Sequence, residues 1–294
     1  MMKITKKYAG RILSIACMSL VLTFLFNFSE LKCFTKSVHA DSADSTSKGI
    51  NVAYHTQDEI RTYIANNGAT VNDALKFSEN PVTTKPYSLG KLSDKTLHSA
   101  LAMLNQVRYI AGISDQVQLD NSYNQLAQAA SLANYLNDTL SHEPEKPAGM
   151  SDDMYNMALK GASSSNISYA SWSGQSLNDV LISGFMCDSD KYNISRVGHR
   201  RWVLNPSMKS TGFGAVSGKN GTYSALYAFD RNNSTAGEYG VAWPAQNMPV
   251  EYFGADYAWS VSMGYKVDAS KIKVTLTRKN DGKKWEFSQE KSDG

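Results

Sequence analysis

Two consecutive segments with helical periodicity limit the folds open to this chain. In the first, apolar residues recur every three or four positions from Leu97 to Ile110, with Ser93 as a plausible cap and Gly112 as the stop. The second runs from about 121 to 140, and its apolar face is rich in alanine, which allows close packing. We therefore expect a core built around two long helices.

Shorter helix and strand patterns follow. Shorter helices are expected at 152–159 and 177–185, and strands at 166–170, 212–216 and 223–229. Asn220-Gly221 suits the turn of a hairpin between the last two strands. Helices mixed with a few antiparallel strands predict an α+β fold.

The first 40 residues predict an export signal. Basic residues precede a charge-free apolar run from Ile12 to Phe28, and Val38-His39-Ala40 offers the small residues of a cleavage site. Cleavage there would give a secreted or cell-surface protein. The alternative is an uncleaved anchor, because 17 apolar residues just reach the length that spans a bilayer. No later segment is apolar enough, so we expect no transmembrane segment after cleavage.

Removing this leader changes the charge and the cysteine count. The full chain has a formal net charge of +3, but the leader holds six of the 30 basic and one of the 27 acidic residues, which leaves −2. We therefore expect no nucleic-acid partner. Cys187 is then the only cysteine, so an intramolecular disulfide is impossible and stability must come from the core.

Composition and periodicity divide the chain into four predicted parts: a signal peptide at 1–40, an N-terminal extension at 41–92, a main domain at 93–239 and a β-rich C-terminal module at 240–294. The module is predicted from alternating apolar residues on either side of an Asp281-Gly282 turn. Whether this module is complete or continues beyond Gly294 stays open.

Two isolated histidines are the best candidates for chemistry. His142 follows the second long helix, and His199 comes 57 residues later in Gly198-His199-Arg200-Arg201-Trp202. Imidazole is a common zinc ligand and the usual proton carrier near neutral pH. The competing interpretation is that both histidines are structural.

Several short motifs, taken in order, resemble the CAP superfamily of cysteine-rich secretory proteins, antigen 5 and plant pathogenesis-related proteins, in particular its bacterial SCP-domain members. The matching pieces are Leu104-Asn105-Gln106-Val107-Arg108, Leu140-Ser141-His142, Asn166-Ile167, Gly198-His199-Arg200, Leu204-Asn205-Pro206 and Gly212-Phe213-Gly214. The resemblance covers about residues 95–230. It implies an α-β-α sandwich with a small antiparallel sheet, and a shallow cleft lined by two histidines and two acidic residues. Some family members bind zinc or another divalent cation there.

Carried over to this chain, the resemblance assigns the cleft to five residues: His142, His199, Ser165, Asn166 and Asp188. The two histidines are then the expected ligands of zinc or another divalent cation. Ser165 stands where the family has a glutamate, and the second acidic position falls at Asp188 or Asp190. Glu143, beside His142, is an alternative carboxylate. The missing glutamate weakens the case for tight zinc binding and for acid–base hydrolysis.

We therefore expect a secreted or cell-surface bacterial protein that requires no cofactor and binds a lipid, a cell-wall component or a host protein. The alternative is a metal-assisted hydrolase or peptidase using the His142/His199 cleft. A third hypothesis is a structural module that spaces other surface components. Cys187 as a nucleophile is disfavoured, because a lone cysteine near a helix end is usually a small buried apolar residue.

Overall fold

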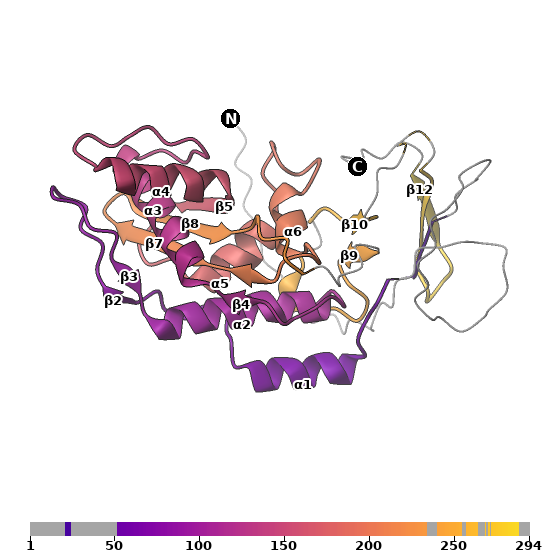
Figure 1. Ribbon diagram of the computed structural model, residues 1–294. Helices are drawn as coiled ribbons and strands as arrows, with labels where there is room; N and C mark the ends of the chain where they lie inside the picture. The colour runs from indigo at the N-terminus through magenta and orange to yellow at the C-terminus, as the bar shows by residue number, and fades with distance from the viewer. Residues whose placement is uncertain are drawn as a thin grey trace, which may run out of the picture. The chain divides into compact units, whose positions relative to one another are not determined.

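The structure is a computed structural model that describes residues 21–24, 52–233, 240–254, 257–263, 268, 270 and 272–287 (Figure 1). Its contacts divide the chain into two compact units. The larger unit holds residues 50–271 with 291–294, and the smaller holds 1–49 with 272–290.

The helices lie in the larger unit. They are α1 (Gln57–Asn67), α2 (Asp94–Ile110), α3 (Asn121–Asn137), α4 (Asp152–Ser163), α5 (Leu177–Asp179), the π-helical segment η1 (Val180–Met186), α6 (Gly198–Val203) and the 3₁₀ turn η2 (Val250–Tyr252). The two long predicted helices are confirmed as α2 and α3. The side chain of Ser93 caps α2 by accepting a hydrogen bond from the amide of Thr96, and Asp120 caps α3 in the same way.

The main sheet has three antiparallel strands, β5 (Ser165–Ala170), β7 (Phe213–Gly218) and β8 (Gly221–Tyr227), in the order β5-β8-β7. The predicted hairpin is confirmed, because Gly218 pairs with Gly221 at the end of β7 and β8. The described part of the unit also holds three two-stranded pairs: β2 (Phe77–Glu79) with β3 (Lys91–Leu92), parallel β4 (Gln118–Leu119) with β6 (Ser210–Thr211), and β9 (Val241–Trp243) with β10 (Ser260–Ser262).

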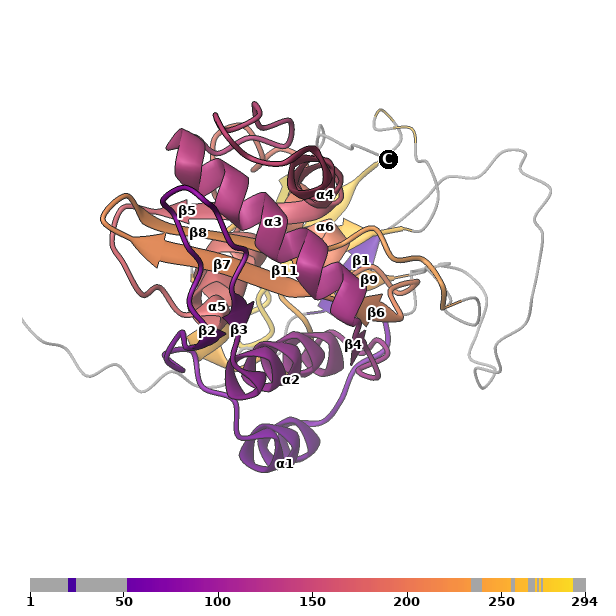
Figure 2. The ribbon, with the colours of Figure 1, turned by 60° about the vertical axis from the view of Figure 1, so that its left-hand side comes forward.

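Helices cover both faces of this sheet (Figure 2). On one face, Ala127 of α3 and Ala162 of α4 cluster with Ala225 of β8. On the other face, Leu226, the next residue of β8, packs in one cluster with residues of α2, α5 and η1. Successive residues of a strand point to opposite faces, so the sheet lies between two helical layers. The α+β class and the α-β-α sandwich are confirmed.

Two glycines bring α3 unusually close to its neighbours. A Cβ on Gly161 of α4 would overlap the carbonyl oxygen of Leu126, and one on Gly214 of β7 would overlap the backbone of Ala127. Both glycines therefore permit backbone-to-backbone packing that a larger residue would prevent. The alanine-rich face of α3 makes the same close approach possible from its own side.

The predicted boundaries at 93 and 240 do not coincide with the boundary between the units. Ile60 of α1 and Trp243 of β9 are fully buried in the same cluster as Leu104 of α2. The extension and the start of the predicted C-terminal module thus contribute to the core of the larger unit. Alternation in the sequence indicates that a strand has a buried face, but not which element covers that face. The predicted tether at 41–51 lies outside the described residues.

The smaller unit contains an antiparallel sheet of β1 (Val21–Phe24), β11 (Val274–Thr277) and β12 (Lys284–Phe287), in the order β1-β11-β12. The predicted hairpin around Asp281-Gly282 is confirmed as β11 and β12. Strand β1 falls inside the predicted leader, and the proposed cleavage site at Val38-His39-Ala40 lies outside the described residues. None of the helices in the described residues is long and apolar enough to cross a membrane.

Candidate functional site

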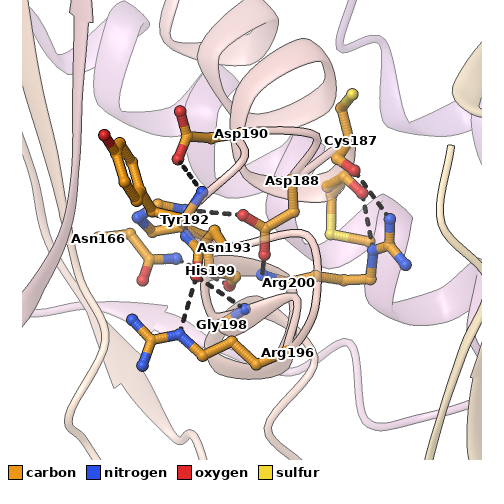
Figure 3. A network of polar contacts seen from close by, with 11 residues as sticks. Asn166, Cys187, Asp188, Asp190, Tyr192, Asn193, Arg196, Gly198, His199 and Arg200 are labelled. Atoms are coloured by element: carbon orange, nitrogen blue, oxygen red, sulfur yellow. Dashed lines mark hydrogen bonds and ion pairs between the residues drawn. The ribbon is translucent and has the colours of Figure 1, made fainter. Parts of the chain in front are cut away.

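His199 lies in the first turn of α6 beside the buried carboxylate of Asp188 (Figure 3). The His199 Nδ1 atom is 2.9 Å from Asp188 Oδ1, and the Asp188 side chain is 0% exposed while that of His199 is 25% exposed. The other carboxylate oxygen accepts a hydrogen bond of 3.2 Å from the backbone amide of Arg200. Both oxygens of Asp188 are thus occupied, and they fix the orientation of the imidazole.

The loop between Asp188 and His199 is strained at both ends. Asp188 has φ +51° and Val197 has φ +44°, and this left-handed conformation is costly for a β-branched side chain. Asn193 holds the loop closed through its Oδ1, which accepts from Gly198 N at 3.3 Å. Its Nδ2 lies 2.6 Å from His199 Nδ1, and this donor competes with Asp188 Oδ1 for the same ring nitrogen. Because the carboxylate is charged and buried, we assign the Nδ1–H hydrogen bond to Asp188.

A short segment joining α4 to β5 contacts both histidines. The carbonyl oxygen of Ala162 lies 2.8 Å from Nδ1 of His142, and Nδ2 of Asn166 donates a 2.9 Å hydrogen bond to the backbone carbonyl of His199. His142 is exposed. A carbonyl oxygen only accepts, so Nδ1 of His142 carries the proton. Each histidine therefore keeps Nε2 as the ring nitrogen with a free lone pair.

Ser165 and Asp190, two further residues that the sequence suggested for the site, do not hydrogen-bond to either imidazole in the described part of the chain. Ser165 is buried, and its Oγ has no hydrogen-bond partner among the described residues. It follows Ala162 by three residues, but strand alternation places it on the opposite face of β5 from Asn166. Asp190 accepts a 2.8 Å hydrogen bond from the amide of Tyr192 and does not share the contact of Asp188 with His199.

Two other predicted candidates lie apart from the imidazole network. Glu143 is exposed, and its backbone amide donates to the Oγ of Ser141. Cys187 is buried, which keeps its thiol away from solvent and removes support for a nucleophile.

Arg200 is the residue whose role the sequence did not define. It is fully buried, and its guanidinium donates to the carbonyls of Met186 at 2.8 Å, Cys187 at 2.9 Å and Ala258 at 2.6 Å. Burial lowers the pKa of Arg200 to about 10, and the nearby Asp188 opposes this shift. Arg200 therefore ties α6 to the end of η1 and to the segment before β10.

The described residues do not fit a zinc centre with three protein ligands. Ligating histidines usually donate their second ring N–H to an oxygen, and His142 and His199 both do so. However, no group of three or more His, Cys, Asp or Glu residues that could hold a metal occurs in the described part of the chain. The two oxygens of Asp188 already contact His199 Nδ1 and the backbone amide of Arg200, and Ser165 has no carboxylate to offer a metal. A catalytic zinc normally has three protein ligands.

The family model described as "CAP: Cysteine-rich secretory protein family" matches residues 101–230. The match extends from α2 past the end of β8 and contains His142, Asn166, Asp188 and His199. Neither the curated proteins nor the solved structures contain a match to the chain. The ordered motifs, the sandwich and the family match agree, so residues 101–230 of this chain form a CAP domain.

Proposed function

We propose that this chain is an exported bacterial protein whose CAP domain binds an amphipathic lipid beside His199. The observation that carries the proposal is the state of that imidazole. Its Nδ1 is held by the buried Asp188, and a quarter of the side chain remains exposed. Nε2 is therefore an oriented polar group that a ligand headgroup can contact.

Exposed apolar side chains in the loop that precedes His199 favour a lipid over a wholly polar ligand. In the loop that leads to His199, the side chain of Tyr192 is 75% exposed and that of Ile194 is 41% exposed. An acyl chain would bury these apolar surfaces, while the imidazole contacts the headgroup. Cell-wall components and host proteins are the other ligand classes to be compared.

Export is supported by the basic residues, the apolar run and the small residues before Asp41 in the first 40 positions. We expect the protein in the culture medium of expressing bacterial cells, with Asp41 as its first residue, as measured by mass spectrometry. Retention in the membrane with the leader attached would contradict this part of the proposal.

The ligand is tested by titrating the purified protein with monomeric dodecylphosphocholine and following the imidazole carbon-bound protons by NMR. We expect the His199 signal to move and saturate, and Ile194→Ala to weaken binding about tenfold, since buried CH₂ groups contribute about 0.8 kcal/mol each. Val82→Ala is the matched control, because Val82 is exposed to a similar extent, 40%. No saturable shift, or equal weakening in the control, would contradict lipid binding.

The oriented imidazole also favours a second candidate, a hydrolase with His199 Nε2 as general base, since a buried carboxylate often orients such a base. The same preparation is incubated with a peptide library and with short esters. Cleavage that disappears in His199→Ala and persists in His98→Gln would establish the hydrolase. If cleavage also requires His142 and an added divalent cation, the metal-assisted form applies.

A further inference from the structure

A groove with both polar and apolar lining runs along α1 and reaches Tyr109 of α2, in a part of the molecule that the family match only partly covers. It has a volume of about 600 Å³, and its lining includes Asp58, Glu59, Tyr63, Asn66, Asn67 and Tyr109. Both ribbon views show α1 lying along the side of α2 that faces away from the main sheet (Figures 1 and 2). Since α1 precedes residue 101, the CAP match alone does not provide this groove.

Stacked aromatic rings form one part of the groove. The ring of Tyr109 stacks on Tyr63, with centroids 4.0 Å apart, and on His55, with centroids 3.8 Å apart. Burial and a hydrogen bond to Asp115 raise the pKa of Tyr63, so its hydroxyl stays neutral at physiological pH. Tyr109 is enclosed between these two rings, so Tyr63 is the residue that can give the groove an aromatic face, with its neutral hydroxyl at the edge.

Hydrogen-bond acceptors form the rest of the lining. Glu59 and Asn66 lie seven residues apart and hence on the same face of α1 as Tyr63. Asn67 Nδ2 donates to the carbonyl of Ala102 at 2.8 Å and to Gln106 Oε1 at 3.0 Å. Both amide protons of Asn67 are used, so its Oδ1 is left as an acceptor.

The acidic side chains of the groove already have partners. Asp58 Oδ1 pairs with Arg61 at 3.0 Å, and Glu59 Oε2 accepts from the amide and hydroxyl of Thr56 in a capping box. Each carboxylate keeps its second oxygen as an acceptor. A cationic ligand would have to compete with Arg61, whereas a ligand that brings hydroxyl donors would not.

We propose that the α1–α2 groove binds a neutral oligosaccharide. Sugar hydroxyls donate to planar carboxylate and amide acceptors, and the C–H face of a sugar ring packs on an aromatic ring, which are the two kinds of group in this lining. The volume lies within the range of small-molecule sites, about 300–1,000 Å³. The proposal is independent of ligand binding beside His199.

Saturation-transfer NMR and calorimetry on the full chain test the proposal, with chitotetraose, cellotetraose, maltotetraose and mannotetraose as probes. At least one probe is expected to bind with a dissociation constant of about 1 mM or below, a weak affinity by the usual scale. We expect Tyr63→Ala and Asn66→Ala to weaken binding by about tenfold. The matched control Tyr192→Ala, which removes an exposed tyrosine elsewhere, is expected to leave it unchanged.

Circular dichroism shows whether Tyr63→Ala disturbs the folding of α1. If it does, Asn66→Ala still tests the proposal, because Asn66 is exposed and its replacement should not disturb the helix. His199→Ala is expected to leave saccharide binding unchanged, so failure of the lipid proposal and of this one are distinguishable. Three results would overturn the proposal: no saturation transfer to any of the four saccharides, equal affinities in wild type and Asn66→Ala, or binding of tetralysine in the groove without saccharide binding.

Discussion

At the scale of single residues, the site depends on how the buried charge of Asp188 is compensated. A buried carboxylate is costly unless hydrogen bonds and an opposite charge replace its lost hydration. His199 and the amide of Arg200 supply the hydrogen bonds, and the Arg200 guanidinium supplies the charge. Asp188 in turn opposes the lowering of the Arg200 pKa that burial causes. The two residues stabilise each other inside the protein.

Replacing Asp188 by alanine should therefore destabilise the larger unit strongly. We expect Asp188→Ala to lower the free energy of unfolding by about 3–5 kcal/mol, because it leaves the buried Arg200 without its carboxylate. Asp190→Ala is the control, since it removes a nearby carboxylate with one turn hydrogen bond, and it should cost about 1 kcal/mol or less. Urea unfolding measures both values. Equal losses would show that Asp188 has no special role.

The family resemblance suggested both histidines and placed the second acidic position at Asp188 or Asp190, but spacing could not choose between the two carboxylates; the structure puts Asp188 beside His199. The choice depends on the left-handed φ of Asp188, which turns the chain at the end of η1. The roles of Asn193 and Arg200 were also out of reach. Most partners of the Arg200 guanidinium are backbone carbonyls, such as Met186 O, and backbone partners leave no pattern in the residue types. Asn193 contacts His199, Arg196 and Gly198 N only because the loop brings them together, and the spacing of residue types does not show this closure.

At the scale of elements, α3 is central because the sheet and α4 both approach its backbone.

The predicted helices and strands were found where the apolar period extends over several residues, as in α2, α3 and β8. The parallel pair β4 and β6 was missed, because two-residue strands are too short to show a period. The segment 177–185 was predicted as a regular helix, whereas most of it is the π-helical η1. Local periodicity does not distinguish these two helix types.

The contact between α3 and α4 at Gly161 should not accommodate even one added methyl group. We expect Gly161→Ala to destabilise the protein by about 1–3 kcal/mol, because its Cβ would overlap the Leu126 carbonyl and outweigh the gain in helix propensity. Gly184→Ala is the matched control, since its nearest atom, Ser168 Oγ, would be 3.9 Å away. Thermal unfolding should separate the two variants. If Gly161→Ala were as stable as Gly184→Ala, the close seam would be refuted.

At the scale of the whole molecule, segments outside the family match complete the core of the larger unit. Ile60 precedes the matched residues and Trp243 follows them, yet both are buried in the same hydrophobic cluster as residues of α2. The boundaries at 93 and 240 were predicted from changes in residue pattern along the chain. Such changes do not show which distant segments pack together in the core. The larger unit therefore should unfold together with α1 and β9 and not as an isolated CAP domain.

The partly and fully buried tyrosines of this unit should make its stability fall at alkaline pH. Burial is the largest cause that raises the pKa of Tyr63, Tyr123 and Tyr223, for Tyr123 to about 12. In the unfolded chain these groups ionise near pH 10. Above pH 10 the folded state holds protons that the unfolded state has released, so the tyrosine contribution to stability is lost as the pH rises through the folded pKa.

Buried arginines act in the opposite direction over the same range. Burial lowers the pKa of Arg108 and of Arg200 to about 10, below the value of 12.5 for a free side chain, so their contribution to stability rises between pH 10 and 12.5. Tyr109, Tyr227 and Tyr252 also have raised pKa values, so the tyrosines with raised pKa outnumber these two arginines. We therefore expect a net loss of stability.

The free energy of unfolding, measured in urea at intervals from pH 8 to 11.5, should be nearly constant at first and then fall above about pH 10. Tyr123→Phe should make that fall less steep, because one half-buried ionisable group with a raised pKa is removed from the folded state. Tyr192→Phe removes an exposed tyrosine and should leave the slope unchanged. A free energy of unfolding that rises from pH 10 to 11 would mean that the buried arginines outweigh the tyrosines, and would contradict the assignment of alkaline unfolding to tyrosine ionisation.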